Sequence, residues 1–186
     1  MEGNEMTKET ESPALAAGSE AIILLGHGSR VPEAGDSLRL VAEGLKSRYR
    51  HTLVEVCFLS RLGPHFEETF ERCIVAGARR VIVIPYFLHG GLHIQLDIPE
   101  MLKKSADLHP GVRVILGDRL GYDDALIDIV ERRIQGSREH PDVRDLSLPP
   151  KEQFPVPPGQ HEFVAMPPEI AVKWREKFEK EGEDDA

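Results

Sequence analysis

The stretch "AIILLGHGSR" (residues 21–30) decides the fold and also points to the functional part of the chain. Its first five residues are all apolar and are bounded by polar residues and glycine, which is typical of a strand buried in a parallel sheet. The next five residues combine two glycines with His27, Ser29 and Arg30. A buried strand that runs into a glycine-rich loop with polar side chains is a frequent position for a ligand site in α/β proteins.

Similar apolar runs alternate with amphipathic segments up to residue 136. Three further strands are expected, at "TLVEVCF" (52–58), "RVIVI" (80–84) and "VRVIL" (112–116). Apolar residues at helical spacing predict intervening helices over about 35–49, from a first turn at Pro64 to Gly77, over 97–108 with Asp97 as cap, and over about 122–136. This alternation predicts a parallel α/β sheet with helices on both faces, and right-handed crossovers predict the strand order 2-1-3-4.

In such a sheet, ligands bind beyond the carboxyl ends of the strands, where the winding direction reverses. That point lies between the first and third strands, which lead into "GHGSR" (26–30) and "PYFLHGGLH" (85–93). His27 and His93 are therefore expected close enough together to share one ion. Neutral imidazole suits divalent Co, Ni, Fe and Zn, and it accepts a proton near neutral pH. The alternative is that these histidines only hydrogen-bond nearby carbonyl groups.

His89 and His93 are four residues apart, a spacing that places two imidazoles on one face of a helix. Gly90 and Gly91 lie between them and disfavour that helix. The sequence therefore favours the pairing of His93 with His27, and His89 is an auxiliary residue at most.

Ser29 is not expected to be a nucleophile, because "GHGSR" matches neither a phosphate-binding P-loop nor a G-x-S-x-G elbow. Its hydroxyl, together with the glycine amides, is instead suited to bind a carboxylate. Arg30 can serve as a fork donor to the same group, unless it is simply exposed to solvent.

Composition excludes several functional classes. The net charge of −9 belongs mostly to the two ends, since residues 21–150 contain 17 basic and 18 acidic side chains. No basic patch with interleaved aromatic residues suggests nucleic-acid binding, and no apolar run is long enough to span a membrane. The N-terminal segment lacks the features of a secretory signal. Cys57 and Cys73 lack metal-binding spacing and are expected to be core thiols of a reduced, cytoplasmic protein.

Three regions are expected along the chain. Residues 1–20 form an acidic, disordered extension, and residues 21–137 form the α/β domain. Residues 138–186 form a Pro-rich and charged extension, in which Ile170, Trp174 and Phe178 suggest a short helix over 168–181.

The segments "LLGHGSR", "VEVCFL" and "GARRVIVIPYFLHGGLHIQLDIP", in this order, resemble the short CbiX-type sirohydrochlorin chelatases. The resemblance spans residues 21–136. It implies a flavodoxin-like single half-domain of the class II chelatase superfamily, with a homodimer forming the cleft that larger relatives build from two lobes. The implied reaction inserts a divalent metal, Co²⁺ first and Fe²⁺ or Ni²⁺ next, into the polycarboxylated tetrapyrrole sirohydrochlorin. The metal is a substrate, and no prosthetic group is implied.

The family's two active-site histidines correspond to His27 and His93, as metal ligands and proton acceptors. His89 and His65 are possible auxiliary residues. The residues expected to bind the tetrapyrrole are Ser29, Arg30, Ser60, Arg61, Gly90 and Gly91.

The chain departs from the family after the second strand. Family members usually carry glutamates in a segment like "FLE-x-x-EP", whereas this chain has "FLSRLGP", with Ser60 and Gly63 at those positions. Glu67 and Glu68 follow, but both are expected to face solvent on a helix. A metal or tetrapyrrole carrier that has lost turnover is therefore the competing function, and an unrelated flavodoxin-like binding module is a third.

Overall fold

The computed structural model describes residues 19–29, 31–61 and 63–150. Its strands are β1 (Ser19–Gly26), β2 (Val54–Phe58), β3 (Ala78–Pro85) and β4 (Arg113–Leu116). Its α-helices are α1 (Asp36–Tyr49), α2 (Phe66–Val75), α3 (Ile98–Leu108) and α4 (Ala125–Ser137). Short helical turns cover Pro32–Gly35, His93–Asp97 and Val143–Asp145.

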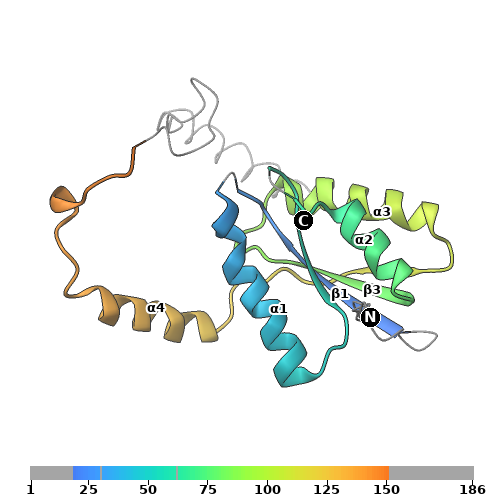
Figure 1. Cartoon of the computed structure of the whole chain (residues 1–186), viewed down its shortest axis with the longest axis horizontal. Coiled ribbons are helices and arrows are strands. Elements are labelled where there is room, and N and C mark those ends of the chain that lie inside the picture. The colour runs from blue at the N-terminus through green and yellow to red at the C-terminus, as the bar shows by residue number, and fades with distance from the viewer. Residues whose placement is uncertain (1–18, 30, 62, 151–186) are drawn as a thin grey trace, which may run out of the picture. The chain divides into compact units, whose positions relative to one another are not determined.

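The four strands form one parallel sheet in the order β2-β1-β3-β4 (Figure 1). Ile22 of β1 is in register with Val54 of β2 on one side and with Ile82 of β3 on the other. The predicted strand order and the flavodoxin-like α/β class are therefore confirmed. The carboxyl ends of β1 and β3 lie side by side, so the loops that follow these two strands begin at the same point of the sheet edge.

One face of the sheet is covered by α2 and α3. Alternate residues of β1 point to this face, where they meet the aromatic residues of α2 and the apolar residues of α3. The largest fully buried side chains of this layer include Phe66, Phe70, Ile23, Leu25 and Ile98. Replacing a buried phenylalanine of this kind by alanine costs about 3 to 5 kcal/mol, so this layer contributes much of the stability of the domain.

The opposite face is covered only over β1 and β2. There α1 packs Leu38 and Ala42 against Ile22 and Leu24, and Phe58 closes the cluster. Helices thus lie on both faces, as predicted.

The last helix is the exception to this packing. It forms close to the expected place, but no residue of α4 is buried. Ile127, Val130 and Ile134, which belong to its apolar stripe, are each at least half exposed.

Two local predictions are wrong. Pro64 is not in the first turn of α2, because the helix begins at Phe66 and His65 is its N-terminal flanking residue. Asp97 does not cap α3 with its side chain. The chain is already helical from His93, in a wider turn of π-type that runs directly into α3, so Asp97 has no free helix end to cap.

The described part of the chain starts with β1, and its last α-helix is α4. β1 begins at Ser19, two residues before the predicted start of the domain at 21. Residues 138–150 are irregular apart from the turn Val143–Asp145, as predicted. The expected helix over 168–181 lies outside the described residues. Among the helices that are described, none has the length and apolar character needed to cross a membrane.

The two thiols are free and fully buried, as expected for core cysteines. Burial raises the pKa of the Cys73 thiol to about 12. Burial, followed by the neighbouring Cys73, also raises the pKa of the Cys57 thiol well above its ordinary value. Neither cysteine therefore carries a thiolate near neutral pH.

Candidate functional site

The carboxyl edge of the sheet brings two histidines together. His27 directly follows β1, and His93 begins the helical turn that follows the β3 loop. Their ring centroids are 5.8 Å apart and their planes meet at 73°. The sequence placed these two residues side by side from the parallel order of β1 and β3 alone, and the geometry agrees.

This separation is suited to a shared ion. With metal–nitrogen bonds of about 2.1 Å, one ion held by two imidazoles places their centroids roughly 5 to 6 Å apart. Both side chains are also open to solvent, and that of His93 is 60% exposed. An ion or a large planar ligand can therefore reach the pair from outside.

Asp97 fixes the orientation of His93. The Nδ1 atom of His93 lies 2.5 Å from Oδ2 of Asp97, which is four residues further along the same helical segment. With Nδ1–H donating to the carboxylate, Nε2 is the nitrogen left for a metal ion or a proton. The sequence predicts only a helix cap at Asp97, so this role is an addition from the structure. The sequence contains one signal for this contact, since His93 and Asp97 in "HIQLD" are four residues apart. This spacing brings two side chains together only when both residues lie on one helix, and the predicted helix over 97–108 does not include His93.

His27 is held mainly through its backbone. Its ring has an edge contact with Phe87, at 6.3 Å between centroids, and its Nδ1 is 3.4 Å from the carbonyl oxygen of Gly28, a weak contact. The carbonyl oxygen of His27 accepts from the backbone N–H of Ser60 at 3.1 Å and from its hydroxyl at 3.2 Å. The loop after β2 thus supports the loop after β1.

Gly28 is required for this close approach of the two loops. Its φ is +96°, and a Cβ atom at this position would lie 1.9 Å from the carbonyl oxygen of Ser60. No other residue fits there without moving the backbone of one loop.

Most of the remaining candidates in the loops after β1 and β2 have partners within the protein. Ser60 supports His27 as described, and Ser29 accepts a hydrogen bond from the N–H of Val31 at 3.0 Å. His65 has its Nδ1 3.2 Å from the carbonyl oxygen of Phe58. Arg61 is exposed, with a φ of 71°.

Glu67 and Glu68, in the first turn of α2, are exposed as predicted. Glu68 forms an ion pair with Arg72 at 2.9 Å, so this carboxylate already has a cationic partner.

The β3 loop exposes His89, Gly90 and Gly91 to solvent, and Arg30 lies outside the described residues. A Cβ atom at Gly90 would lie 3.7 Å from the guanidinium carbon of Arg119. Arg119 is thus a further cation at the same edge, in addition to those predicted from the sequence. A single arginine in the loop after β4 carries no pattern that could have marked it.

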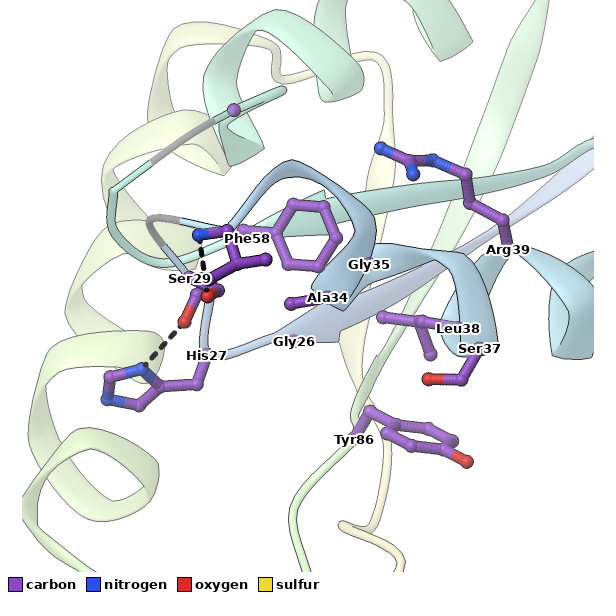
Figure 2. A pocket seen from close by; sticks show the side chains of 13 residues that line it. Gly26, His27, Ser29, Ala34, Gly35, Ser37, Leu38, Arg39, Phe58 and Tyr86 are labelled. Atoms are coloured by element: carbon purple, nitrogen blue, oxygen red, sulfur yellow. Dashed lines mark hydrogen bonds between the residues drawn. The ribbon is translucent and has the colours of Figure 1, made fainter. Parts of the chain in front are cut away.

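A pocket of about 230 Å³ lies beside His27, between the β1 loop and the start of α1. Figure 2 shows His27 at one end of this pocket and Arg39 at the other, with Tyr86 and Ser37 between them. Arg39 is paired with Asp36 at 2.6 Å. Pockets that enclose a whole drug-sized ligand measure about 300 to 1,000 Å³, so this pocket can hold only part of a large ligand.

Within the described residues, no group of three or more His, Cys, Asp and Glu side chains is arranged around a possible metal ion. The pair His27–His93, with Asp97 beside His93, thus offers an ion two imidazoles and not a complete set of ligands.

The model of the CbiX family matches residues 21–137, the segment that contains every element of the site. The chain belongs to the CbiX family. This CbiX-family chain is 36% identical over 115 residues to the sirohydrochlorin ferrochelatase of Priestia megaterium, covering 62% of the chain and 43% of that protein. It is 30% identical over 142 residues to the sirohydrochlorin cobaltochelatase of Methanococcus aeolicus, covering 63% of the chain and 99% of that protein.

A solved structure is similar as well. The sirohydrochlorin chelatase SirB from Bacillus subtilis subspecies spizizenii, in complex with cobalt, superposes with a TM-score of 0.59 at 32% identity. The match covers 63% of this CbiX-family chain and 50% of SirB. The chain thus spans about half the length of its bacilli relatives and nearly the whole length of the methanogen relative.

Proposed function

We propose that this protein inserts a divalent metal ion into sirohydrochlorin. The observation that carries the proposal is the His27–His93 pair, whose ring centroids are 5.8 Å apart at the carboxyl edge of the sheet. It is supported by the family of the chain and by the names of its relatives, which are sirohydrochlorin ferrochelatases and cobaltochelatases.

Two imidazoles suit the transfer of an ion better than its storage. Insertion requires that the ion exchange its bound water and protein ligands for the four nitrogens of the macrocycle. A site with few protein ligands leaves coordination positions open for that exchange. Nε2 of His93 and the imidazole of His27 hold the ion until the macrocycle nitrogens replace them.

The same imidazoles take up protons. Two pyrrole N–H groups of the macrocycle lose their protons as the metal enters, and neutral imidazole is the side chain best suited to accept them near neutral pH. Asp97 accepts the Nδ1–H of His93 and stabilises the imidazolium that forms when Nε2 is protonated. No prosthetic group takes part in this sequence of steps.

The substrate's carboxylates require cations around this edge. Arg61 and Arg119 are exposed there, and the pocket between His27 and Arg39 has the size for a peripheral acid side chain rather than for the macrocycle. The glycines of the β3 loop, Gly90 and Gly91, leave room for the flat ring to approach. Arg30 is assigned to the same role by its place in "GHGSR".

Co²⁺ is the first candidate for the metal, and Fe²⁺ and Ni²⁺ are the next. Imidazole is permissive among these ions, and the relatives include both cobaltochelatases and ferrochelatases. A competition assay with equal concentrations of the three ions, followed by absorbance of the metallated products, identifies the preferred one.

We further propose that the protein is cytoplasmic and acts as a homodimer. The pocket at His27 is smaller than the substrate, so a second copy facing the same edge would complete the cleft. Neither a membrane nor a nucleic acid is part of this proposal.

The direct test mixes purified protein with sirohydrochlorin and Co²⁺ and follows the absorbance of the tetrapyrrole. The metallated product should form faster than in the control without protein. An unchanged rate, together with tight binding of metal or tetrapyrrole, would instead favour a carrier. That second function is supported by one observation, the lack of any acidic residue between Phe58 and His65.

A further inference from the structure

The loop after β4 is fastened to the loop after β3 by two backbone hydrogen bonds. Leu120 donates its N–H to the carbonyl oxygen of Pro85 at 3.3 Å. Gly121 donates to the carbonyl oxygen of Phe87 at 3.1 Å, and its φ of +56° is one that glycine adopts without strain. Arg119 directly precedes these two donors, so its backbone is held against the β3 loop.

The side chain of Arg119 lies flat against Gly90 of the β3 loop. A Cβ atom at Gly90 would be 3.7 Å from the guanidinium carbon, 3.8 Å from one terminal nitrogen and 3.9 Å from Nε. Because the central carbon is as close as the nitrogens, the plane of the guanidinium faces Gly90. The N–H groups of a guanidinium point outward in its plane, so this stacking does not use them.

Arg119 forms no ion pair with an acidic side chain in the part of the chain that the structure describes. Arg39, by contrast, is paired with Asp36 at 2.6 Å. Ordering an exposed arginine for a ligand costs side-chain entropy. The stacking on Gly90 lowers that cost, because the guanidinium already has a defined position. Arg119 is therefore a preorganised cation with donors available to an anion.

Gly90 also places this cation close to the imidazole pair. The N–H groups of Ile94 and Gln95 donate to the carbonyl oxygen of Gly91 at 3.0 and 3.1 Å, so the helical turn of His93 begins directly after Gly90. In the proposed function, a metal at Nε2 of His93 becomes the centre of the macrocycle, whose carboxylates stand around its rim. A cation stacked three residues before His93 is placed for that rim and not for the centre.

Exposed leucines lie on both sides of Gly90 in the sequence. Leu88 is 48% exposed, and Leu92, the residue before His93, is 70% exposed. Neither a bare metal ion nor a small carboxylic acid requires apolar surface of this kind. A tetrapyrrole combines a flat apolar ring with an anionic rim, so it matches leucines that adjoin an unpaired arginine.

We propose that Arg119, held in place by Gly90, binds one peripheral carboxylate of the tetrapyrrole and thereby fixes the orientation of the macrocycle over His93. This inference rests on the proposed function and adds to it a residue that determines specificity. Two parallel N–H donors of a guanidinium match the two oxygens of a carboxylate. A tetrapyrrole whose carboxylate at this position is amidated or missing is therefore bound more weakly.

Titration with the metal-free tetrapyrrole tests this role without any turnover. Sirohydrochlorin alone is added to the full chain, and its absorbance is followed. Arg119→Ala should raise the Kd about 10- to 100-fold, the scale of hydrogen bonds to charged groups. Arg119→Lys keeps the charge without the planar fork and should recover only part of the affinity. Added NaCl should change the Kd of Arg119→Ala less than that of the unmodified chain.

Arg113→Ala is the matched control, because Arg113 is an exposed arginine at the opposite, amino end of β4. It should keep the Kd and the salt dependence of the unmodified chain. When Co²⁺ is added, Arg119→Ala should raise the KM for sirohydrochlorin and leave kcat unchanged, since both imidazoles are intact.

A double-mutant cycle tests whether Gly90 acts through Arg119. Gly90→Leu fills the space against which the guanidinium lies, so it should weaken the binding of metal-free sirohydrochlorin. Combined with Arg119→Ala, it should add less than about a further twofold, because residues that act through one contact are not additive. Fully additive losses would mean that the larger side chain obstructs the ring itself, and that Gly90 does not position Arg119.

The outcomes separate this inference from the proposed function. An unchanged Kd in Arg119→Ala, or an equal loss in Arg113→Ala, would overturn the inference. If Arg119→Ala weakens binding but the unmodified chain inserts no metal, the carboxylate contact stands and only the catalytic function fails. Metal insertion by the unmodified chain, with the same KM in Arg119→Ala, would refute the inference alone.

Discussion

The loops after β1, β2 and β3 begin at the same edge of the sheet, but the loop after β2 differs from the other two in the chemistry of its side chains. The first two bring the imidazoles of His27 and His93 together, and the β3 side also supplies the carboxylate of Asp97. The loop after β2 contains no acidic residue, and its best-placed polar group, Ser60, binds the backbone of His27. In the proposed function, the reactive groups therefore lie in the loops after β1 and β3, and the loop after β2 supports them.

The largest expected effect concerns the two imidazoles. His27→Ala and His93→Ala should each lower the rate of metal insertion about 10² to 10⁴-fold, because each removes a ligand and a proton acceptor. Stopped-flow absorbance of sirohydrochlorin with Co²⁺ measures the rates. His140→Ala, an exposed histidine outside the site, is the control and should keep the rate of the unmodified chain. Unmodified rates in both site variants would refute the assignment of the site.

The second prediction tests whether Asp97 orients His93 for metal binding or only stabilises the fold. Asp97→Ala should weaken Co²⁺ binding or lower the insertion rate about 10- to 100-fold, since a partner that orients a metal-binding histidine contributes on this scale. The KM for sirohydrochlorin should stay the same. Asp97→Glu should recover part of the metal affinity, which calorimetry measures. Equal losses for Ala and Glu, with a raised KM for the tetrapyrrole, would contradict this role.

A third prediction concerns the contact between the β1 and β2 loops. Gly28→Ala should destabilise the fold by about 1 to 2 kcal/mol from its positive φ alone, with a further cost from the contact with Ser60. Urea unfolding measures the change. Gly44→Ala is the matched control, because Gly44 lies in α1 with open space around its Cα, and alanine there should stabilise the helix by about 0.5 to 1 kcal/mol. If Gly28→Ala left the free energy of unfolding unchanged, the contact between the β1 and β2 loops would not contribute to stability.

The smallest effect is expected for restoring a carboxylate to the β2 loop. If Asp97 already supplies the carboxylate that the site needs, Ser60→Glu should change the insertion rate by less than about threefold, because the backbone N–H of residue 60 still donates to the carbonyl oxygen of His27. The same absorbance assay measures it. A hundredfold rise in the insertion rate would mean that the site lacks a carboxylate from the β2 loop. It would favour the carrier function for the unmodified chain.

The sheet and the pairing of His27 with His93 could be predicted because they depend on short patterns. Four short runs rich in apolar residues indicate parallel strands, and the strand order then brings the ends of β1 and β3 together. No side-chain contact had to be known for either step.

Other parts of the site could not be predicted in this way. Asp97 directly precedes "IP", a strong signal for a helix cap, and the wider turn from His93 has no residue pattern of its own. Arg119 is near Gly90 only through the tertiary path of the chain after β4. The periodicity of α4 shows that the helix has an apolar face, but it says nothing about which surface covers that face.

The burial of Cys57 and Cys73 has a consequence for the handling of metals. Thiolates bind cobalt, nickel and iron more strongly than a single imidazole does, and an accessible thiolate near the site would trap ions meant for transfer. Because both thiols are enclosed by the core and stay protonated, neither cysteine offers an incoming ion a thiolate ligand. We therefore expect that neither air nor an excess of free metal modifies these two cysteines in the folded protein.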